Sequence, residues 1–320
     1  MSDVALLNRT LAIEVARVTE AAALAAYKLA GRGDEKAADQ AAVDAMRRAF
    51  DKLEIDGTVV IGEGERDEAP MLFIGEKVGT GRGPKVDIAL DPLEGTTLTA
   101  KSMPGAMAVV ALAVGGTLLH APDVYMDKIA IGGGYPAGVV DLDADPADNI
   151  AALAKAKGVR AEQITACILD RPRHEKIIAA VRKTGAAVRL ITDGDVAGVI
   201  DTAEAHTGVD IYIGQGGAPE GVLAAAALRC IGGQIQGRLV FKTDDERMRA
   251  ERLGLKDLTR KYTTAEMASG DVIFASTGVT TGSMLTGVLD TAHHLTTETV
   301  VMRSATGTVR WIKTRHPKLA

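Results

Sequence analysis

The chain has 320 residues, of which 47% are hydrophobic and 3% aromatic, and its formal net charge is −5. That length can bury the core of one large domain or of two fused halves, whereas so few aromatic residues argue against an interaction module rich in Tyr and Trp. No block of Lys or Arg stands out in the sequence, which argues against a nucleic-acid partner.

Two features indicate a soluble cytoplasmic protein. The longest apolar run, residues 106–114, is far too short to span a bilayer, and charged residues such as Glu14 and Arg17 interrupt the N-terminal apolar pattern, so we expect neither a membrane span nor a signal peptide. Cys167 and Cys230 lie in apolar contexts, where we expect two buried free thiols in a reducing compartment.

The first part of the chain predicts helices followed by short strands. Leu7, Leu11, Val15, Val18 and Ala22 recur at helical spacing. The expected elements, in chain order, are helix 3–30, helix 34–53, strand 58–61, the loop GEGERDEAP, a helix from about Ala69, a surface turn at 79–84 and strand 86–90.

The rest of the chain predicts a strand-rich middle and then a regular alternation. The run AMAVVALAV at 106–114 is typical of a strand covered on both faces. After it we expect strands 164–169, 187–191 and 209–213 between helices 146–157, 173–184, 195–203 and 219–228, then helix 244–253 and strands near 271–276 and 298–303. This alternation indicates βαβ units and a parallel or mixed sheet, hence an α/β fold.

The segment VDIALDPLEGTT, residues 86–97, places two carboxylates beside a strand that reads as buried. Pro92 cannot continue a ladder, so we expect the chain to turn directly after Asp91. Gly95 allows a close approach of the backbone, and Thr96 offers a hydroxyl that can cap the next helix. Asp91 and Glu94 are therefore expected to face a cation in the crevice where open α/β sheets bind ligands.

Further carboxylates lie near other strand ends and helix starts, namely Asp39, Glu63, Glu65 and Glu220. Taken singly, Asp39 reads as a solvated helix residue, Glu65 as loop surface and Glu220 as a first-turn residue that favours the helix dipole. Buried carboxylates in such number need cations, and hard divalent metals such as Mg²⁺ and Mn²⁺ are the natural partners. The histidines lack zinc-site spacing.

Three loops could bind phosphate and hydroxyl groups. RPR at 171–173, DGD at 193–195 and GQGGAPEG at 214–221 each follow one of the consecutive strands, so they should share one sheet edge. Taken singly, they read as surface charge, a helix N-cap and a weak glycine pattern. Together they combine Arg for phosphate, Asp for hydroxyls and a helix start for anions, which is the chemistry of a polyol-phosphate site.

The motifs IGEGERDEAPML, DPLEGTT, RPRH, ITDGD and GGAPEG, in this order and spacing, resemble the class II fructose-1,6-bisphosphatases. These belong to the metal-dependent, lithium-sensitive sugar and inositol phosphatases. The resemblance runs from about residue 10 to the C-terminus and implies a layered α/β/α/β/α sandwich. It also implies hydrolysis of the 1-phosphate of fructose 1,6-bisphosphate, a gluconeogenic reaction, by in-line attack of water at two metal ions.

The resemblance further implies a set of site residues and partners. The implied metal ligands, for Mn²⁺ or Mg²⁺, are Asp39, Glu63, Asp91, Glu94 and Glu220, and the implied catalytic residues are Thr96, which orients the water, and Glu63. The implied substrate contacts are Glu94, Gly95, Thr96, Tyr125, Arg171, Pro172, Arg173, Asp193, Gly194, Asp195 and Gly217. We expect a homo-oligomer, a dimer or tetramer, with no membrane partner.

We expect residues 1–320 to form a single catalytic unit, with a metal-binding half at 1–145 and a substrate-binding half at 146–320. An inositol or nucleotide phosphatase is the alternative within the same chemistry, and activity on sedoheptulose 1,7-bisphosphate stays open. A nicotinamide dehydrogenase is disfavoured because no G-x-G-x-x-G fingerprint is present. A non-catalytic sugar-phosphate sensor would not need five metal-binding carboxylates.

Overall fold

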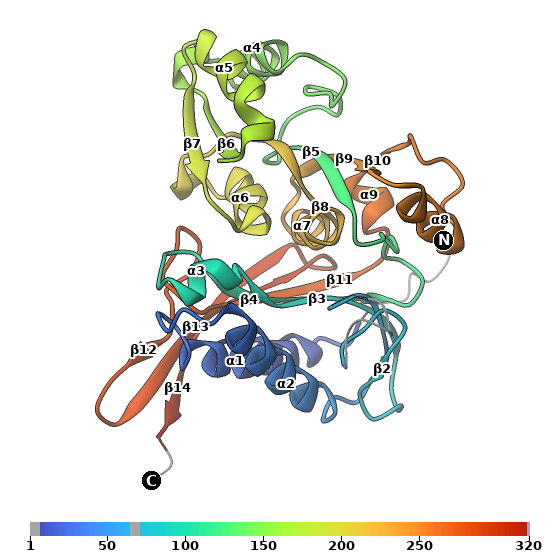
Figure 1. Ribbon diagram of the computed structural model, residues 1–320, viewed down its shortest axis with the longest axis vertical. Helices are drawn as coiled ribbons and strands as arrows, with labels where there is room; N and C mark the ends of the chain where they lie inside the picture. Colours follow the sequence, from blue (N-terminus) through green and yellow to red (C-terminus); the bar gives the residue numbers. More distant parts are fainter. Residues whose placement is uncertain (1–6, 65–70, 319–320) are drawn as a thin grey trace. The chain divides into compact units, whose positions relative to one another are not determined.

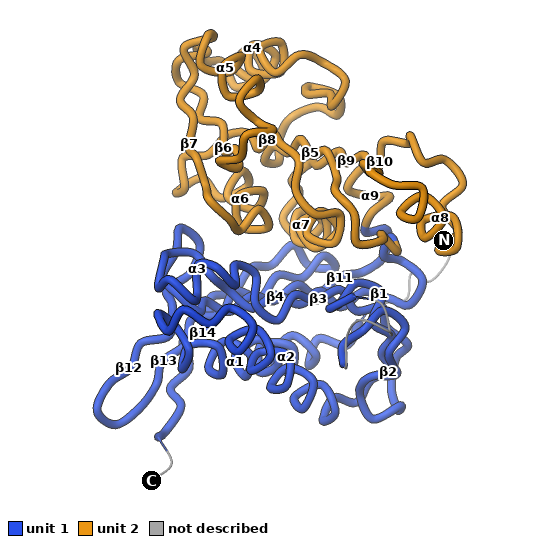
Figure 2. Tube along the Cα trace, in the orientation of Figure 1, with its two compact units in different colours: residues 1–119, 268–320 blue, residues 120–267 orange. Residues whose placement is uncertain are grey.

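A computed structural model describes residues 7–64 and 71–318 of the chain (Figure 1). Its contacts divide the protein into two compact units, coloured separately in Figure 2. The first unit combines residues 1–119 with 268–320, and the second comprises residues 120–267. The C-terminal segment therefore belongs with the N-terminal one, although a whole unit separates them in the sequence.

The first unit contains an eight-stranded mixed sheet in the order β12-β13-β11-β4-β3-β1-β2, with β14 paired to β13. Its central strands are antiparallel, whereas β1 runs parallel to β3. The strands are β1 (Asp56–Ile61), β2 (Lys77–Val78), β3 (Lys85–Glu94), β4 (Met107–Val114), β11 (Val272–Gly278), β12 (Leu289–Asp290), β13 (His294–Arg303) and β14 (Thr308–Pro317).

Helices α1 (Leu11–Tyr27) and α2 (Glu35–Phe50) pack on this sheet, and the short helix α3 (Thr96–Ala100) follows β3 (Figure 1). The apolar stripe predicted for α1 is confirmed, since Val15, Val18 and Ala22 are fully buried in the core of the unit. Asp34 caps α2 by accepting a hydrogen bond from the backbone N–H of Ala37 at 2.9 Å, which satisfies one of the free donors at the helix start.

Strand β3 does not end at Asp91 as predicted. Asp91 pairs with Val109 and Glu94 pairs with Met107, so three steps along β3 match two steps along β4. This is a β-bulge at Pro92 and Leu93, and it accommodates the missing N–H of proline within the sheet. The prediction of a turn directly after Asp91 was therefore wrong, because the ladder resumes at Glu94.

The second unit contains a six-stranded mixed sheet in the order β10-β9-β5-β8-β6-β7. The predicted βαβ alternation is confirmed, since β6 runs parallel to both β7 and β8, while β5 is antiparallel to β8 and β9. The strands are β5 (Tyr125–Ile131), β6 (Thr165–Leu169), β7 (Ala187–Ile191), β8 (Ile211–Gly217), β9 (Gln234–Val240) and β10 (Lys261–Thr263).

Helices cover both faces of this second sheet. Ile150 and Leu153 of α4 and Val181 of α5 share a core with Ile213 of β8, whereas Tyr212, one position earlier on β8, packs against Gly198 of α6. Consecutive strand residues point to opposite faces, so these helices lie on opposite sides. The helices are α4 (Pro146–Lys157), α5 (Glu175–Lys183), α6 (Asp195–Ile200), α7 (Ala218–Ile231), α8 (Asp244–Arg252) and α9 (Thr264–Met267).

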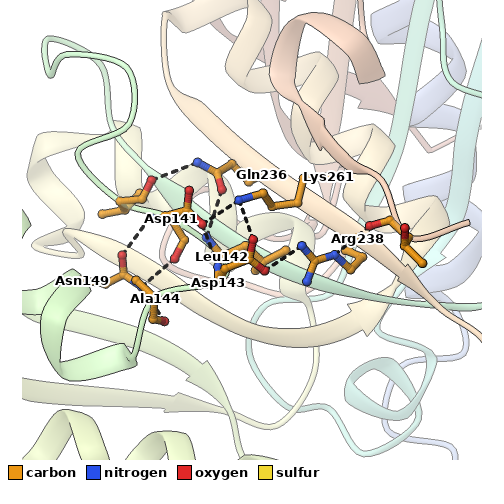
Figure 3. A network of polar contacts seen from close by, with 10 residues as sticks. Asp141, Leu142, Asp143, Ala144, Asn149, Gln236, Arg238 and Lys261 are labelled. Carbon is orange, nitrogen blue, oxygen red and sulfur yellow. Dashed lines mark hydrogen bonds and ion pairs between the residues drawn. The ribbon is translucent and has the colours of Figure 1, made fainter. Parts of the chain in front are cut away.

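A polar network ties the turn-rich segment before α4 to strands β9 and β10 (Figure 3). Lys261 contacts Asp141 and Asp143, both at 2.7 Å, and Arg238 contacts Asp143 at 2.7 Å. The Asn149 side chain accepts from the backbone N–H of Asp141 and donates to its carbonyl. These contacts hold an irregular segment in place where no ladder of backbone hydrogen bonds does so.

Other predicted elements differ from the structure. The helix predicted at 3–30 begins only at Leu11, since the described residues before it form a non-helical segment that ends in a turn. Residues 71–76 form turns rather than a helix, and the rest of the helix predicted from Ala69, like Glu65, lies outside the described residues. Gly214–Gly217, predicted as a loop, continue β8 because β5 pairs with β8 along its whole length. Within the described ranges, no helix is both long and apolar enough to cross a membrane.

We predict that Leu112→Ala lowers the free energy of unfolding by about 2–5 kcal/mol, because Leu112 is fully buried in the centre of β4 and its truncation leaves a cavity. Urea denaturation measures this change. Leu289→Ala is the matched control, since Leu289 is 51% exposed and the same truncation there should cost less than about 0.5 kcal/mol. Equal losses in the two variants would contradict the assignment of β4 to the core.

Candidate functional site

Four of the predicted metal ligands lie in the first unit, and we call Asp39, Glu63, Asp91 and Glu94 the carboxylate cluster. Asp39 comes from α2, Glu63 follows β1, and Asp91 and Glu94 flank the bulge of β3. Asp91 and Glu94 each offer a carboxylate oxygen within 4.8 Å of the other's. The bulge therefore brings together two carboxylates that a regular strand, with alternating side chains, would place on opposite faces.

Backbone contacts fix the elements that carry the cluster. The N–H groups of Gly31 and Gly33 donate to the last carbonyls of α3, those of Thr99 and Ala100, at 2.9 and 3.0 Å. This ties the start of α2, and hence Asp39, to the segment that follows Glu94. Glu63 is held in turn because its N–H donates to the carbonyl of Leu72 at 3.0 Å.

The electrostatics of the cluster show mutual repulsion between its members. Burial raises the pKa of Glu63 to about 9, and the charges of Asp91 and Asp39 add to this shift. Burial also raises the pKa of Asp39 to about 6, again with a contribution from Asp91. The neighbouring charges that act on both groups are carboxylates, so these oxygens fit a divalent cation, which would relieve the repulsion and replace lost hydration.

Gly95 and Thr96 follow the cluster at the start of α3. Gly95 is the N-cap, with a φ of 90° that only glycine adopts readily, and a Cβ there would lie 2.9 Å from Leu98. Thr96 is the first residue of the helix and makes no cap, so the prediction that its hydroxyl caps was wrong. Its side chain is half-buried directly after Glu94 and Gly95.

The other predicted residues, including Glu220, lie in the second unit, where the loops after β6, β7 and β8 share one sheet edge as predicted. Glu220 occupies the first turn of α7, and Gly217 is the N-cap of that helix. A Cβ on Gly217 would lie 1.9 Å from the Glu220 carboxylate, so glycine is required for this side chain to fold back over the helix start.

Arg173 and Tyr125 contact each other in this unit. The guanidinium of Arg173 donates to the carbonyl of Gln215 through Nε and Nη2 at 3.2 and 2.7 Å, and its Cζ lies 5.0 Å from the ring centroid of Tyr125. Arg171 is half-buried and donates to the carbonyl of Asp170. The RPR loop after β6 is thus attached to β8 and β5, and Pro172 stiffens it.

Asp195 is buried and ion-paired rather than open to solvent. It is 6% exposed and forms an ion pair at 2.5 Å with Lys128, which is 1% exposed and also donates to the carbonyl of Gly217 at 2.9 Å. Asp193 is half-buried, and one of its oxygens accepts from the N–H of Gly194 at 3.2 Å. Lys128 therefore links the DGD loop to the start of α7.

The sequence reasoning missed three residues around this edge: Lys128, His174 and Lys242. His174 directly follows the RPR motif, and its ring bridges two strands, with Nδ1 2.7 Å from the carbonyl of Leu169 and Nε2 accepting from the N–H of Gln215 at 2.8 Å. These contacts require a neutral ring with the proton on Nδ1. Lys128 lies within a mostly apolar strand, and Lys242 directly precedes the N-cap of α8, so neither belongs to a recognisable sequence motif.

Comparisons with known proteins were made over the whole chain. Residues 9–316 match the family described as bacterial fructose-1,6-bisphosphatase, glpX-encoded. The chain is 46% identical to fructose-1,6-bisphosphatase 1 class 2 of Escherichia coli K12 and to fructose-1,6-bisphosphatase class 2 of Shigella flexneri. Each alignment covers 97% of this chain and 96% of the relative.

A search of solved structures found an inositol monophosphatase from Anabaena (Nostoc) sp. PCC 7120. It is 15% identical, with a TM-score of 0.31 over 61% of this chain and 72% of that one. A likeness at that score supports no argument about function.

We predict that His174 destabilises the folded protein as the pH is lowered below about 6.5, against an opposite contribution from Asp39 and Glu63, whose raised pKa values favour proton uptake by the folded state. Burial, and then nearby Arg173 and Arg171, hold the pKa of His174 below its ordinary value of 6.5, although its hydrogen bond to Leu169 opposes this. In the unfolded chain His174 therefore binds a proton at a pH where the native ring is still neutral. This residue contributes at most about 1.4 kcal/mol per pH unit to the slope of the free energy of unfolding against pH.

Urea denaturation of wild type and His174→Gln at pH 7.5, 6.5 and 5.5 tests this expectation. The variant should lose stability at pH 7.5, but as the pH falls to 5.5 its free energy of unfolding should fall less, or rise more, than that of wild type. His293→Gln is the control, because His293 is exposed in the turn between β12 and β13 and its replacement should leave the slope of wild type. An unchanged slope in His174→Gln would refute the assignment.

Proposed function

Since the chain belongs to the family of bacterial class 2 fructose-1,6-bisphosphatases, we propose that it hydrolyses the 1-phosphate of fructose 1,6-bisphosphate with Mn²⁺ or Mg²⁺ as its cofactor. The products are fructose 6-phosphate and inorganic phosphate. The observation that carries the proposal is the carboxylate cluster, in which burial and like charge raise the pKa values of Asp39 and Glu63. Carboxylates crowded in this way fit divalent cations, and the proposed phosphatase reaction needs such cations.

The proposed metal ligands are the carboxylate cluster together with Glu220 of α7. Divalent ions held there would neutralise charge on the phosphate and make water a competent nucleophile near neutral pH. Among the residues of the chain itself, Thr96 orients the attacking water through its hydroxyl. Glu63 is suited to accept the proton of that water, because burial, and then the charges of Asp91 and Asp39, raise its pKa.

The proposed substrate contacts fall into two groups. Glu94, Gly95 and Thr96 surround the reacting 1-phosphate, while Tyr125, Arg171, Pro172 and Arg173 bind the distal phosphate, which does not react. Asp193, Gly194 and Gly217 bind the sugar, and Asp195 supports that edge through Lys128. Binding energy from the distal phosphate is then available to orient the reacting one.

The two units have different roles under this proposal. Four metal ligands come from residues 39–94, whereas the contacts to the sugar and the distal phosphate come from residues 125–217. We further propose that the enzyme is a cytoplasmic homo-oligomer, and its two cysteines, both buried and free, suit a reducing compartment. Sedoheptulose 1,7-bisphosphate, which also carries a distal phosphate, is a second candidate substrate.

We predict that exhaustive EDTA treatment abolishes phosphate release and that Mn²⁺ or Mg²⁺ restores it. With metal present, fructose 1,6-bisphosphate should be hydrolysed far faster than inositol 1-phosphate, because only the bisphosphate can use the Arg173 loop. Sedoheptulose 1,7-bisphosphate, assayed in parallel, reports whether the site accepts a longer sugar. Full activity after chelation would disprove the metal requirement, and faster hydrolysis of inositol 1-phosphate would disprove the substrate.

Two variants of α2 test the carboxylate cluster directly. Asp39→Asn should raise the Mn²⁺ concentration that gives half-maximal activity by about tenfold, since it removes one charged ligand. Asp34→Asn on the same helix is the control, because Asn caps a helix as well as Asp does and lies outside the cluster.

We predict that Thr96→Ala lowers kcat by about 10²-fold while KM stays near the wild-type value, since a misplaced water costs rate rather than binding. Steady-state assays with saturating Mn²⁺ measure both constants. Thr97→Ala, the next position on α3 with the same half-buried environment, should keep kcat within about twofold. A wild-type kcat in Thr96→Ala would remove the water-orienting role from that hydroxyl.

A further inference from the structure

Two cations contact the ring of Tyr125. The Lys242 ammonium lies 3.8 Å from the ring centroid, and the Arg173 guanidinium carbon lies 5.0 Å from it. Both distances are within the range of cation–π attraction, which stabilises each cation against the ring. All three residues belong to the second unit, and Arg173 and Tyr125 are already proposed to bind the distal phosphate.

The fold places Lys242 beside Tyr125 through backbone structure. Strand β9 pairs with β5 so that Val240 lies opposite Tyr125, and Lys242 follows two residues later. Its backbone N–H donates to Glu246 Oε2 at 2.5 Å, next to a capping box in which Thr243 and Glu246 cap the start of α8. The main chain at Lys242 is therefore held by a helix cap, while its side chain extends to the ring.

The two cations at the ring are not neutralised by ion pairs among the described residues. Among the described residues, neither Lys242 nor Arg173 forms an ion pair with a carboxylate, whereas Lys128, Lys261 and Arg238 in the same unit all do. Glu246 engages the backbone of Lys242, and Arg173 uses two of its donors on the carbonyl of Gln215. Two cations near one ring repel each other, and an anion that contacts both would offset this repulsion.

We propose that Lys242 contacts the distal phosphate of the substrate together with Arg173, and so favours bisphosphates over monophosphates. This inference rests on the proposed function and extends it by one residue. The ring of Tyr125 acts as a spacer that holds both cations in place before the phosphate arrives, so that little side-chain entropy is lost on binding. Lys242 supplies a point charge, and Arg173 supplies directed hydrogen bonds.

Binding of fructose 6-phosphate tests the inference without catalysis, because this product carries only the distal phosphate. Calorimetry with the Mn²⁺-loaded enzyme should show about tenfold weaker binding in Lys242→Met, whose unbranched side chain can still pack on the ring. Lys242→Arg should restore binding to within about threefold of wild type. Lys256→Gln, at an exposed lysine in the same unit, should leave the affinity unchanged.

Kinetics provide the second measurement. Lys242→Met should raise KM about tenfold for fructose 1,6-bisphosphate but leave KM for fructose 1-phosphate, which lacks the distal phosphate, within about twofold. Unchanged fructose 6-phosphate binding in Lys242→Met, or equal rises in both KM values, would overturn the inference and leave Lys242 as a packing residue. Failure of the proposed function looks different, since wild type would then release no phosphate from fructose 1,6-bisphosphate.

Discussion

Repulsion among partly buried carboxylates is the constraint on which the site depends. Burial raises the pKa of Asp39 to about 6 and that of Glu63 to about 9, and the charge of Asp91, joined for Glu63 by that of Asp39, adds to each shift. A fold that gathers such groups accepts a loss of stability that only protons or cations can offset. Under the function proposed for this chain, divalent cations would do this and supply the chemistry as well.

The bulge in β3 is what makes this gathering possible. A regular strand would point Asp91 and Glu94 to opposite faces, since they are three positions apart. The bulge at Pro92 and Leu93 inserts one extra residue and so changes the face to which the following side chains point. Carboxylate oxygens of Asp91 and Glu94 come within 4.8 Å of each other as a result. The proline, which at first suggests the end of a strand, instead marks an interruption that the sheet tolerates because no N–H is needed there.

The second unit places cations as well as carboxylates at a sheet edge. Side-chain hydrogen bonds hold its loops, with His174 and Arg173 joining the RPR loop to β8 and Lys128 joining the DGD loop to Gly217. Lys128 is paired with Asp195, whereas Arg171, Arg173 and Lys242 form no ion pair with a carboxylate in the described part of this unit, and the last two contact the ring of Tyr125. That arrangement suits a dianionic phosphate.

The sequence by itself determined the α/β class, the βαβ alternation and the family, and it predicted the residues of the site, because periodicity and motif chemistry are local properties of a chain. It did not reveal that β11–β14 complete the sheet of the first unit, because pairing with β4 joins residues more than 150 positions apart. Nor did it show that β8 continues through Gly217, or that Lys128, His174 and Lys242 stand beside the predicted residues. Strand pairing and side-chain contacts across strands are tertiary interactions, so only the folded structure decided them.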